Sequence, residues 1–109
     1  MANIYKNAKV DFTTTDNTTV YTVPSNSRAI LKNILVSDDS GSGDSITATL
    51  TNASAAIFSL FKSKTIGANA TTELIAQPII LEESEILKAQ ATTAGRLHMV
   101  VSLLEINRD

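Results

Sequence analysis

The chain has 109 residues, of which 43% are hydrophobic and 18% are charged, with no cysteine and a formal net charge of −2. This length suits one domain, residues 1–109, and leaves no room for a second. Without cysteine there is no disulfide and no cysteine-based zinc site, and scattered Lys and Arg argue against a nucleic-acid partner. No segment approaches the ~18 consecutive apolar residues of a membrane-spanning helix. The first residues also lack the pattern of a signal peptide, so we expect no membrane partner and synthesis in the cytosol.

Polar residues of three kinds dominate the composition, because Ser, Thr and Asn together make up nearly a third of the chain. Thr favours strands, whereas Ser and Asn favour turns. Long-chain helix formers are correspondingly scarce. The composition therefore predicts β structure.

The chain opens with two expected strands separated by a polar break. Residues 5–15 place Ala8, Val10 and Phe12 at alternate positions, which is the period of a strand with one buried face. Residues 18–23 follow and end at a proline, which cannot donate a ladder hydrogen bond.

Residues 28–37 form the most apolar expected strand. Simple alternation assigns Ile30, Ile34 and Val36 to one face, and Ala29, Leu31 and Leu35 to the other. A strand that is apolar on both faces is typical of the centre of a sheet, or of a surface covered by another chain.

The middle of the chain predicts two further strands after a flexible loop at 38–44. Residues 45–52 alternate cleanly, with Ile46, Ala48 and Leu50 expected inside. Residues 56–62 also predict a strand, with a short helix at 53–58 as the alternative. Alternation here assigns Ile57 and Phe61 to one side, and Phe58 and Leu60 to the other.

The last third of the chain predicts several short strands and one long one. The short strands are 73–76, 79–81 and 86–91, and the long strand, 96–106, places Leu97, Met99, Val101 and Leu103 on one face. Many short strands with closely spaced turns indicate a sandwich or barrel. We therefore expect an all-β fold, a compact antiparallel β-sandwich of jelly-roll type with about eight strands.

The chain offers little material for catalysis. His98 is its single histidine, and no carboxylate or nucleophile in the sequence is marked out as its partner. We therefore expect no catalytic residue, no enzyme activity and no cofactor.

Two acidic clusters are the remaining candidates for chemistry. Asp38, Asp39 and Asp44 lie in a Gly/Ser loop, where a calcium site is conceivable, but their spacing is not that of an EF-hand. Glu82, Glu83 and Glu85 form an acidic turn with no associated substrate cleft. We interpret both as solvated turns, and we expect no metal site, although cation binding by the aspartate loop stays open.

An excess of apolar residues is more informative. Phe58, Leu60 and Phe61 crowd one strand, and residues 30–36 are apolar on both faces. A small sandwich has only one inner layer, so some of these side chains must face outward. Contact with a partner chain would cover them.

The sequence resembles a group of small structural proteins of tailed bacteriophages, especially phages of aquatic bacteria such as cyanophages. The resemblance is carried by a threonine-rich strand, a Val-Pro turn and an apolar strand over residues 20–36 (VYTVPSNSRAILKNILV), by the acidic turn LEESEIL at 81–87, and by the closing strand LHMVVSLLEI at 97–106. These are patterns of strand and turn, not chemical signatures.

The resemblance implies a non-enzymatic β-sandwich component of the virion, assembled in the host cytoplasm. A capsid decoration or cement protein that binds and stabilises the head lattice is the first expectation. A neck, tail or fibre component is the alternative within the virion, and a carbohydrate-binding adhesion module is the alternative outside that class.

The expected partners are the major capsid protein or other virion proteins, with further copies of the chain in a trimer or ring. Residues 1–12 are a possible N-terminal arm. The contact candidates are Ile4, Tyr5, Phe12, Phe58 and Phe61.

Overall fold

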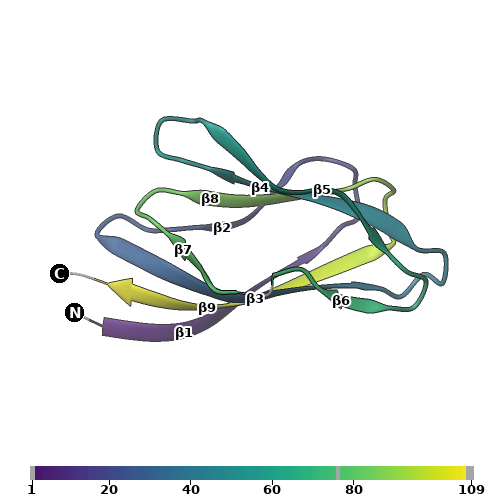
Figure 1. Cartoon of the computed structure of the whole chain (residues 1–109), viewed down its shortest axis with the longest axis horizontal. Helices are drawn as coiled ribbons and strands as arrows, with labels where there is room; N and C mark the ends of the chain where they lie inside the picture. The colour runs from purple at the N-terminus through teal and green to yellow at the C-terminus, as the bar shows by residue number, and fades with distance from the viewer. Residues whose placement is uncertain (1, 76, 108–109) are drawn as a thin grey trace.

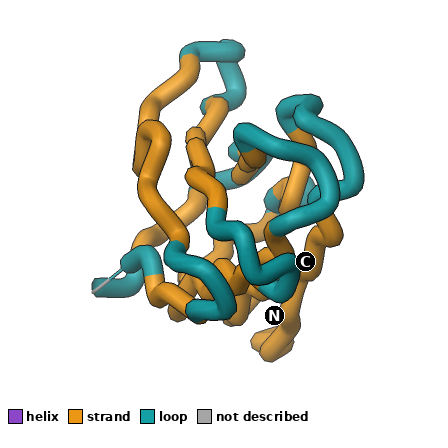
Figure 2. Tube along the Cα trace, turned by 90° about the vertical axis from the view of Figure 1, so that its right-hand side faces the viewer, coloured by secondary structure: helices purple, strands orange, loops and turns teal. Residues whose placement is uncertain are grey.

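The computed structural model describes residues 2–75 and 77–107, and within these ranges every regular element is a strand. Figure 2 accordingly shows strands and loops and no helix among the described residues. No described helix is long and apolar enough to cross a membrane. The all-β prediction is confirmed, and residues 57–66 form a strand, not the helix considered at 53–58.

The described residues form nine strands. They are β1 (Ala2–Asp11), β2 (Thr18–Thr22), β3 (Ser27–Asp38), β4 (Asp44–Thr51), β5 (Ile57–Ile66), β6 (Thr71–Glu73), β7 (Ile79–Leu81), β8 (Ile86–Ala91) and β9 (Leu97–Asn107). One sheet, called sheet A here, has the order β1-β9-β3-β6, with β7 also paired to β3. The other, sheet B, has the order β2-β8-β4-β5. Figure 1 shows the two sheets as two layers, with β1, β9 and β3 below and β2, β8, β4 and β5 above.

Strands β6 and β7 act as one interrupted edge strand. Both run antiparallel to β3, with β7 opposite residues 29–31 and β6 opposite residues 35–37. Counted together they give eight strands in two four-stranded sheets. In this count β6 and β7 are the sixth strand, β8 is the seventh and β9 is the eighth. One sheet then has the strand order 1-8-3-6 and the other has 2-7-4-5, which is the connectivity of a jelly roll. The predicted β-sandwich of jelly-roll type is confirmed.

The core lies between the two sheets and follows the predicted alternation in the regular strands. In β9 all four residues expected inside are at most 1% exposed: Leu97, Met99, Val101 and Leu103. In β4 Ile46 and Ala48 are fully buried, and Leu50 packs against the core from its edge. These side chains stabilise the fold by about 25 cal/mol for each Å² of apolar surface removed from water.

Simple alternation is wrong for β3, because the strand carries a β-bulge at Lys32. Leu31 pairs with Leu103, whereas Asn33 pairs with Ser102, so Lys32 is an extra residue. The extra residue reverses the facing of the second half of the strand. The fully buried residues are therefore Ala29, Leu31, Ile34 and Val36, while Ile30 and Leu35 face outward.

A second irregularity, in β5, also changes the predicted faces. The pairing of β4 with β5 shifts around Ala48, so that Ala48 is opposite Phe61 and Leu50 is opposite Phe58. Directly opposite residues of an antiparallel pair point to the same side. Phe58 and Phe61 therefore share the core-facing side of sheet B, and are not on opposite faces.

Deleting Lys32 tests whether the bulge sets the facing of β3. Without the extra residue, Ile34 and Val36 would turn outward, and each buried aliphatic side chain lost from the core costs about 1.5–3 kcal/mol. We expect the deletion to lower the free energy of unfolding by several kcal/mol, or to prevent folding, as measured by urea denaturation. The substitution Lys32→Ala is the control, because it keeps the residue count and alters only an exposed side chain. A deletion variant as stable as this control would contradict the assignment.

Candidate functional site

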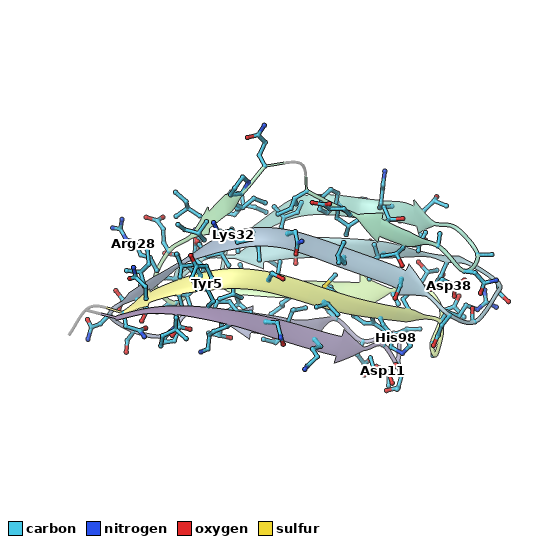
Figure 3. The ribbon with its side chains drawn as sticks, turned by 90° about the horizontal axis from the view of Figure 1, so that it is seen from below. Tyr5, Asp11, Arg28, Lys32, Asp38 and His98 are labelled. Carbon is cyan, nitrogen blue, oxygen red and sulfur yellow. The ribbon has the colours of Figure 1, made fainter. Side chains whose placement is uncertain are left out.

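The structure places His98 between two carboxylates that the sequence alone did not connect to it. Nε2 lies 3.1 Å from Oδ1 of Asp11, and Nδ1 lies 3.6 Å from Oδ1 of Asp39. Asp11 is positioned by β1, where it is the direct cross-strand neighbour of His98. Figure 3 shows His98 and Asp11 together at one end of sheet A.

This arrangement is a cluster of three polar side chains on an open surface. Each ring nitrogen of His98 faces a carboxylate, so neither is left to take a proton from a substrate. The side chains of Asp11 and Asp39 are 63% and 69% exposed, so water is not excluded from the cluster. The geometry therefore suits a surface polar cluster better than a general base.

Asp38, the first residue of the aspartate loop, turns inward and binds backbone N–H groups. Its Oδ1 accepts hydrogen bonds from the amide and the hydroxyl of Ser40, and its Oδ2 accepts from the amides of Gly43 and Asn69, at 2.8 and 3.1 Å. The bonds from Ser40, with those from the two other amides, hold the pKa of the Asp38 carboxyl well below its usual range. Asp38 therefore ties the 38–43 loop to the turn at 67–70.

The three aspartates of this loop do not converge. Asp44 accepts a hydrogen bond of 2.7 Å from the amide of Thr93, while Asp39 faces His98. Among the described residues no group of three or more His, Asp or Glu side chains has the arrangement of a metal site. The oxygens of Asp38 are engaged by N–H and O–H donors, which is the role of a loop cap.

In the acidic turn between β7 and β8, one carboxylate closes the turn and another ties it to the residues between β2 and β3. Oε1 of Glu85 accepts from the amide of Glu82, and Oε2 of Glu83 accepts from the amide of Asn26, both at 2.7 Å. A cavity of about 680 Å³ lies between this turn, the β4–β5 turn and the start of β3. Its lining is mainly polar and includes no aromatic side chain, so it lacks the stacking surface that sugars favour.

A buried carboxylate stands out among the polar groups that sequence reasoning missed. The side chain of Glu105 in β9 is 5% exposed, and its Oε2 accepts hydrogen bonds from Nζ of Lys6 at 3.0 Å and from the hydroxyl of Tyr21 at 2.7 Å. The bond from Tyr21 and the ion pair with Lys6 lower the pKa of Glu105, while burial and the nearby carboxylate raise that of Tyr21 well above its usual range. Its burial could have been inferred from its position in the sequence, because Glu105 follows Leu103 by two residues and so continues the alternating series of β9 residues that face the core.

The expected contact residues divide between surface and core. Ile4 and Tyr5 in β1 are 40% and 78% exposed, and Phe58 in β5 is 54% exposed. Phe61 is half-buried and packs against the core. Phe12 is 1% exposed and belongs to the core between the sheets.

Residues 2–11, within the segment expected as a possible arm, form an edge strand of sheet A. They pair with β9 through ten consecutive residues, from Ala2 opposite Asn107 to Asp11 opposite His98. In the isolated chain this segment therefore belongs to the sandwich.

The comparison with solved structures finds a similar fold over nearly the whole chain. A chain in the acidic stable capsid structure of Helicobacter pylori bacteriophage KHP30 superimposes with a TM-score of 0.57 at 9% sequence identity, covering 99% of this chain and 95% of that chain. At this identity the likeness establishes the fold. No protein-family model and no curated protein sequence matches the chain.

The pH dependence of stability should depend on Glu105. Because its pKa is lowered by folding, the ionised form stabilises the fold above the unfolded-state pKa, and this contribution is lost as the pH falls through the lower folded-state pKa. We expect Glu105→Gln to lower the free energy of unfolding at pH 7 by about 1–3 kcal/mol, and the difference from the wild type to shrink below about pH 4. Glu73→Gln, at an exposed position of β6, is the control. Parallel curves for the wild type and Glu105→Gln across the acid range would contradict this assignment.

Asp38 should govern the protection of two distant amides. In Asp38→Ala we expect faster hydrogen exchange at Gly43 and Asn69, because both amides lose their acceptor. Amide exchange followed by NMR measures this directly. Asp39→Ala, at the next and exposed position, should leave both rates unchanged; equal effects of the two substitutions would argue against the capping role.

Proposed function

We propose that this chain is a non-enzymatic structural protein of a bacteriophage particle, and that it acts there as a capsid decoration, or cement, protein. The observation that carries the proposal is the likeness of the complete jelly roll to a chain of a phage capsid structure, with 99% and 95% of the two chains covered. A likeness over both full lengths relates whole domains, not a shared fragment. Fold likeness by itself does not fix function, so the surface has to agree.

The polar groups of the described residues agree with a structural role. The carboxylates of Asp38, Glu83 and Glu85 accept hydrogen bonds from backbone amides. The carboxylate of Glu105 in β9 accepts hydrogen bonds from Lys6 in β1 and Tyr21 in β2, and so joins the three strands. His98 lies between two exposed carboxylates. These groups hold strands and turns together, which is what a protein that must resist mechanical or chemical stress requires.

The exposed apolar side chains support a binding role. Tyr5 and Ile80 are each more than half exposed. Burial of such groups against another protein supplies most of the free energy of association. The partners we propose are the major capsid protein or other virion proteins, with the chain itself present as a trimer or ring in particles that are assembled in the host cytoplasm.

Mixing the purified chain with empty heads of the phage whose genome encodes it tests the proposal. A cement protein should co-sediment with heads at a fixed ratio and should raise their melting temperature, because a ligand that binds only the intact lattice stabilises it by mass action. The melting temperature of the heads is read by light scattering with and without the chain.

Two other outcomes would redirect the assignment. Binding to tails, necks or fibres but not to heads would overturn the cement role and favour the other virion location. A chain that ignores every virion part but binds glycans would overturn the structural proposal as a whole.

A further inference from the structure

The two outer faces of the sandwich differ in character. On sheet B the outward positions of β4 and β8 pair Thr47 with Gln90 and Thr49 with Lys88, so this face is polar at its centre. On sheet A the outward positions of four strands carry large apolar side chains. The part of the apolar excess carried by residues 30–36 therefore lies on the outer face of sheet A, whereas Phe58, Leu60 and Phe61 belong to β5 of sheet B.

A continuous row of apolar side chains crosses sheet A. Tyr5 of β1 is opposite Leu104 of β9, Leu104 is opposite Ile30 of β3, and Ile30 is opposite Ile80 of β7. Tyr5 and Ile80, at the two ends of this apolar row, are 78% and 64% exposed, and the two central residues are partly exposed. Cross-strand neighbours on one face lie about 5 Å apart, so the row is a connected surface and not a set of isolated residues.

Further along the same face lies a smaller apolar pair. Val100 of β9, 39% exposed, is opposite Leu35 of β3, which faces outward because of the bulge at Lys32. Polar Ser102 and Asn33 separate this pair from the apolar row. The face therefore combines apolar area with polar groups, as protein interfaces do.

Cations lie beside the apolar row. Arg28 and Lys32 are exposed on β3, on either side of Ile30. Lys9 of β1 and Glu73 of β6 are exposed at the two ends of the neighbouring row, which contains Val100 and Leu35. Figure 3 views sheet A from outside and shows Arg28, Lys32 and Tyr5 in the same half, with Asp11 and His98 at the far end. Asp11 is already within 3.1 Å of His98. The two charges of β3 that flank the apolar row are therefore both cationic, on a chain whose net charge is −2.

We infer that the outer face of sheet A is the docking surface of this chain, and that it receives a virion protein surface with an apolar centre and acidic side chains around it. The inference rests on the proposed function and adds to it which face binds and what chemistry the partner presents. Charge complementarity selects such a partner, because Arg28 and Lys32 attract carboxylates at the rim and an apolar centre covers Tyr5 and Ile80.

A second copy of the chain fits this face less well. Two copies stacked with their apolar rows in contact would bring Arg28 and Lys32 of each close to the same residues of the other, and like charges brought together at an interface disfavour association. The occupant is therefore a different protein.

Two double variants of sheet A, each with a matched double variant of β5 as its control, test the inference. Empty heads of the encoding phage are the binding probe. Tyr5→Ser/Ile80→Ser removes the two exposed ends of the apolar row, and Ile57→Ser/Phe58→Ser removes two comparably exposed apolar groups on β5. Arg28→Glu/Lys32→Glu reverses the local charge, and Lys62→Glu/Lys64→Glu makes the same net change at exposed positions of β5. A cooperative thermal unfolding transition in each of the four double variants verifies that the variant is folded.

We expect both sheet A variants to weaken binding to heads by about 10-fold or more, and both β5 variants to bind within about 3-fold of the wild type. Binding by the wild type should also weaken as salt is raised, because rim charges are screened. In the Arg28→Glu/Lys32→Glu variant this salt dependence should be lost or reversed.

Each other result overturns a distinct statement. A wild-type chain that binds heads, with sheet A variants that bind equally well, would overturn the docking face and leave the proposed function standing. Loss of binding in Ile57→Ser/Phe58→Ser alone would move the docking surface to β5. A wild-type dimer in solution that Tyr5→Ser/Ile80→Ser dissociates would make a second copy the occupant. Heads that do not bind the wild type would overturn the proposed function, and this inference with it.

Discussion

A jelly roll of this size has a single inner layer, and its central strand must present apolar side chains to that layer along its whole length. In β3 the bulge at Lys32 meets this constraint, because it turns Ala29 and Leu31 before it, and Ile34 and Val36 after it, toward the same core. The same extra residue decides what is left outside. The outer face of sheet A, with its cations and apolar residues, is therefore a consequence of how the core is filled.

Regular alternation is the part of the fold that the sequence predicts well. The inward residues of β9 and β4 follow from period two, and the turns follow from clusters of Gly, Ser, Asn and Asp. The irregularities in β3 and β5 could not be predicted in this way, because nothing in the side chain of Lys32 or in the sequence of β5 requires an irregular backbone. A bulge is set by the register of the neighbouring strand, which the sequence does not display.

The polar clusters depend on register in the same way. Lys6 and Glu105 are 99 residues apart in the chain, and only the pairing of β1 with β9 brings them together. Asp11 reaches His98 through the same pairing. Sequence reasoning therefore recognised His98 and the acidic turns as candidates but could not name their partners. Period two did assign Phe12 to a buried face together with Ala8 and Val10, and Phe12 is 1% exposed.

The inward position of Lys6 has a consequence for solubility. β1 ends sheet A, and its outer edge is ten residues long and carries no described strand. Flat edges of this length serve as templates for fibril-type association, and one way that natural sheets prevent it is a charged side chain that points inward from the edge strand. The ammonium group that binds Glu105 is such a charge. An edge guarded in this way resists backbone pairing with the edge of another copy, so the protein can be concentrated without extending its sheets.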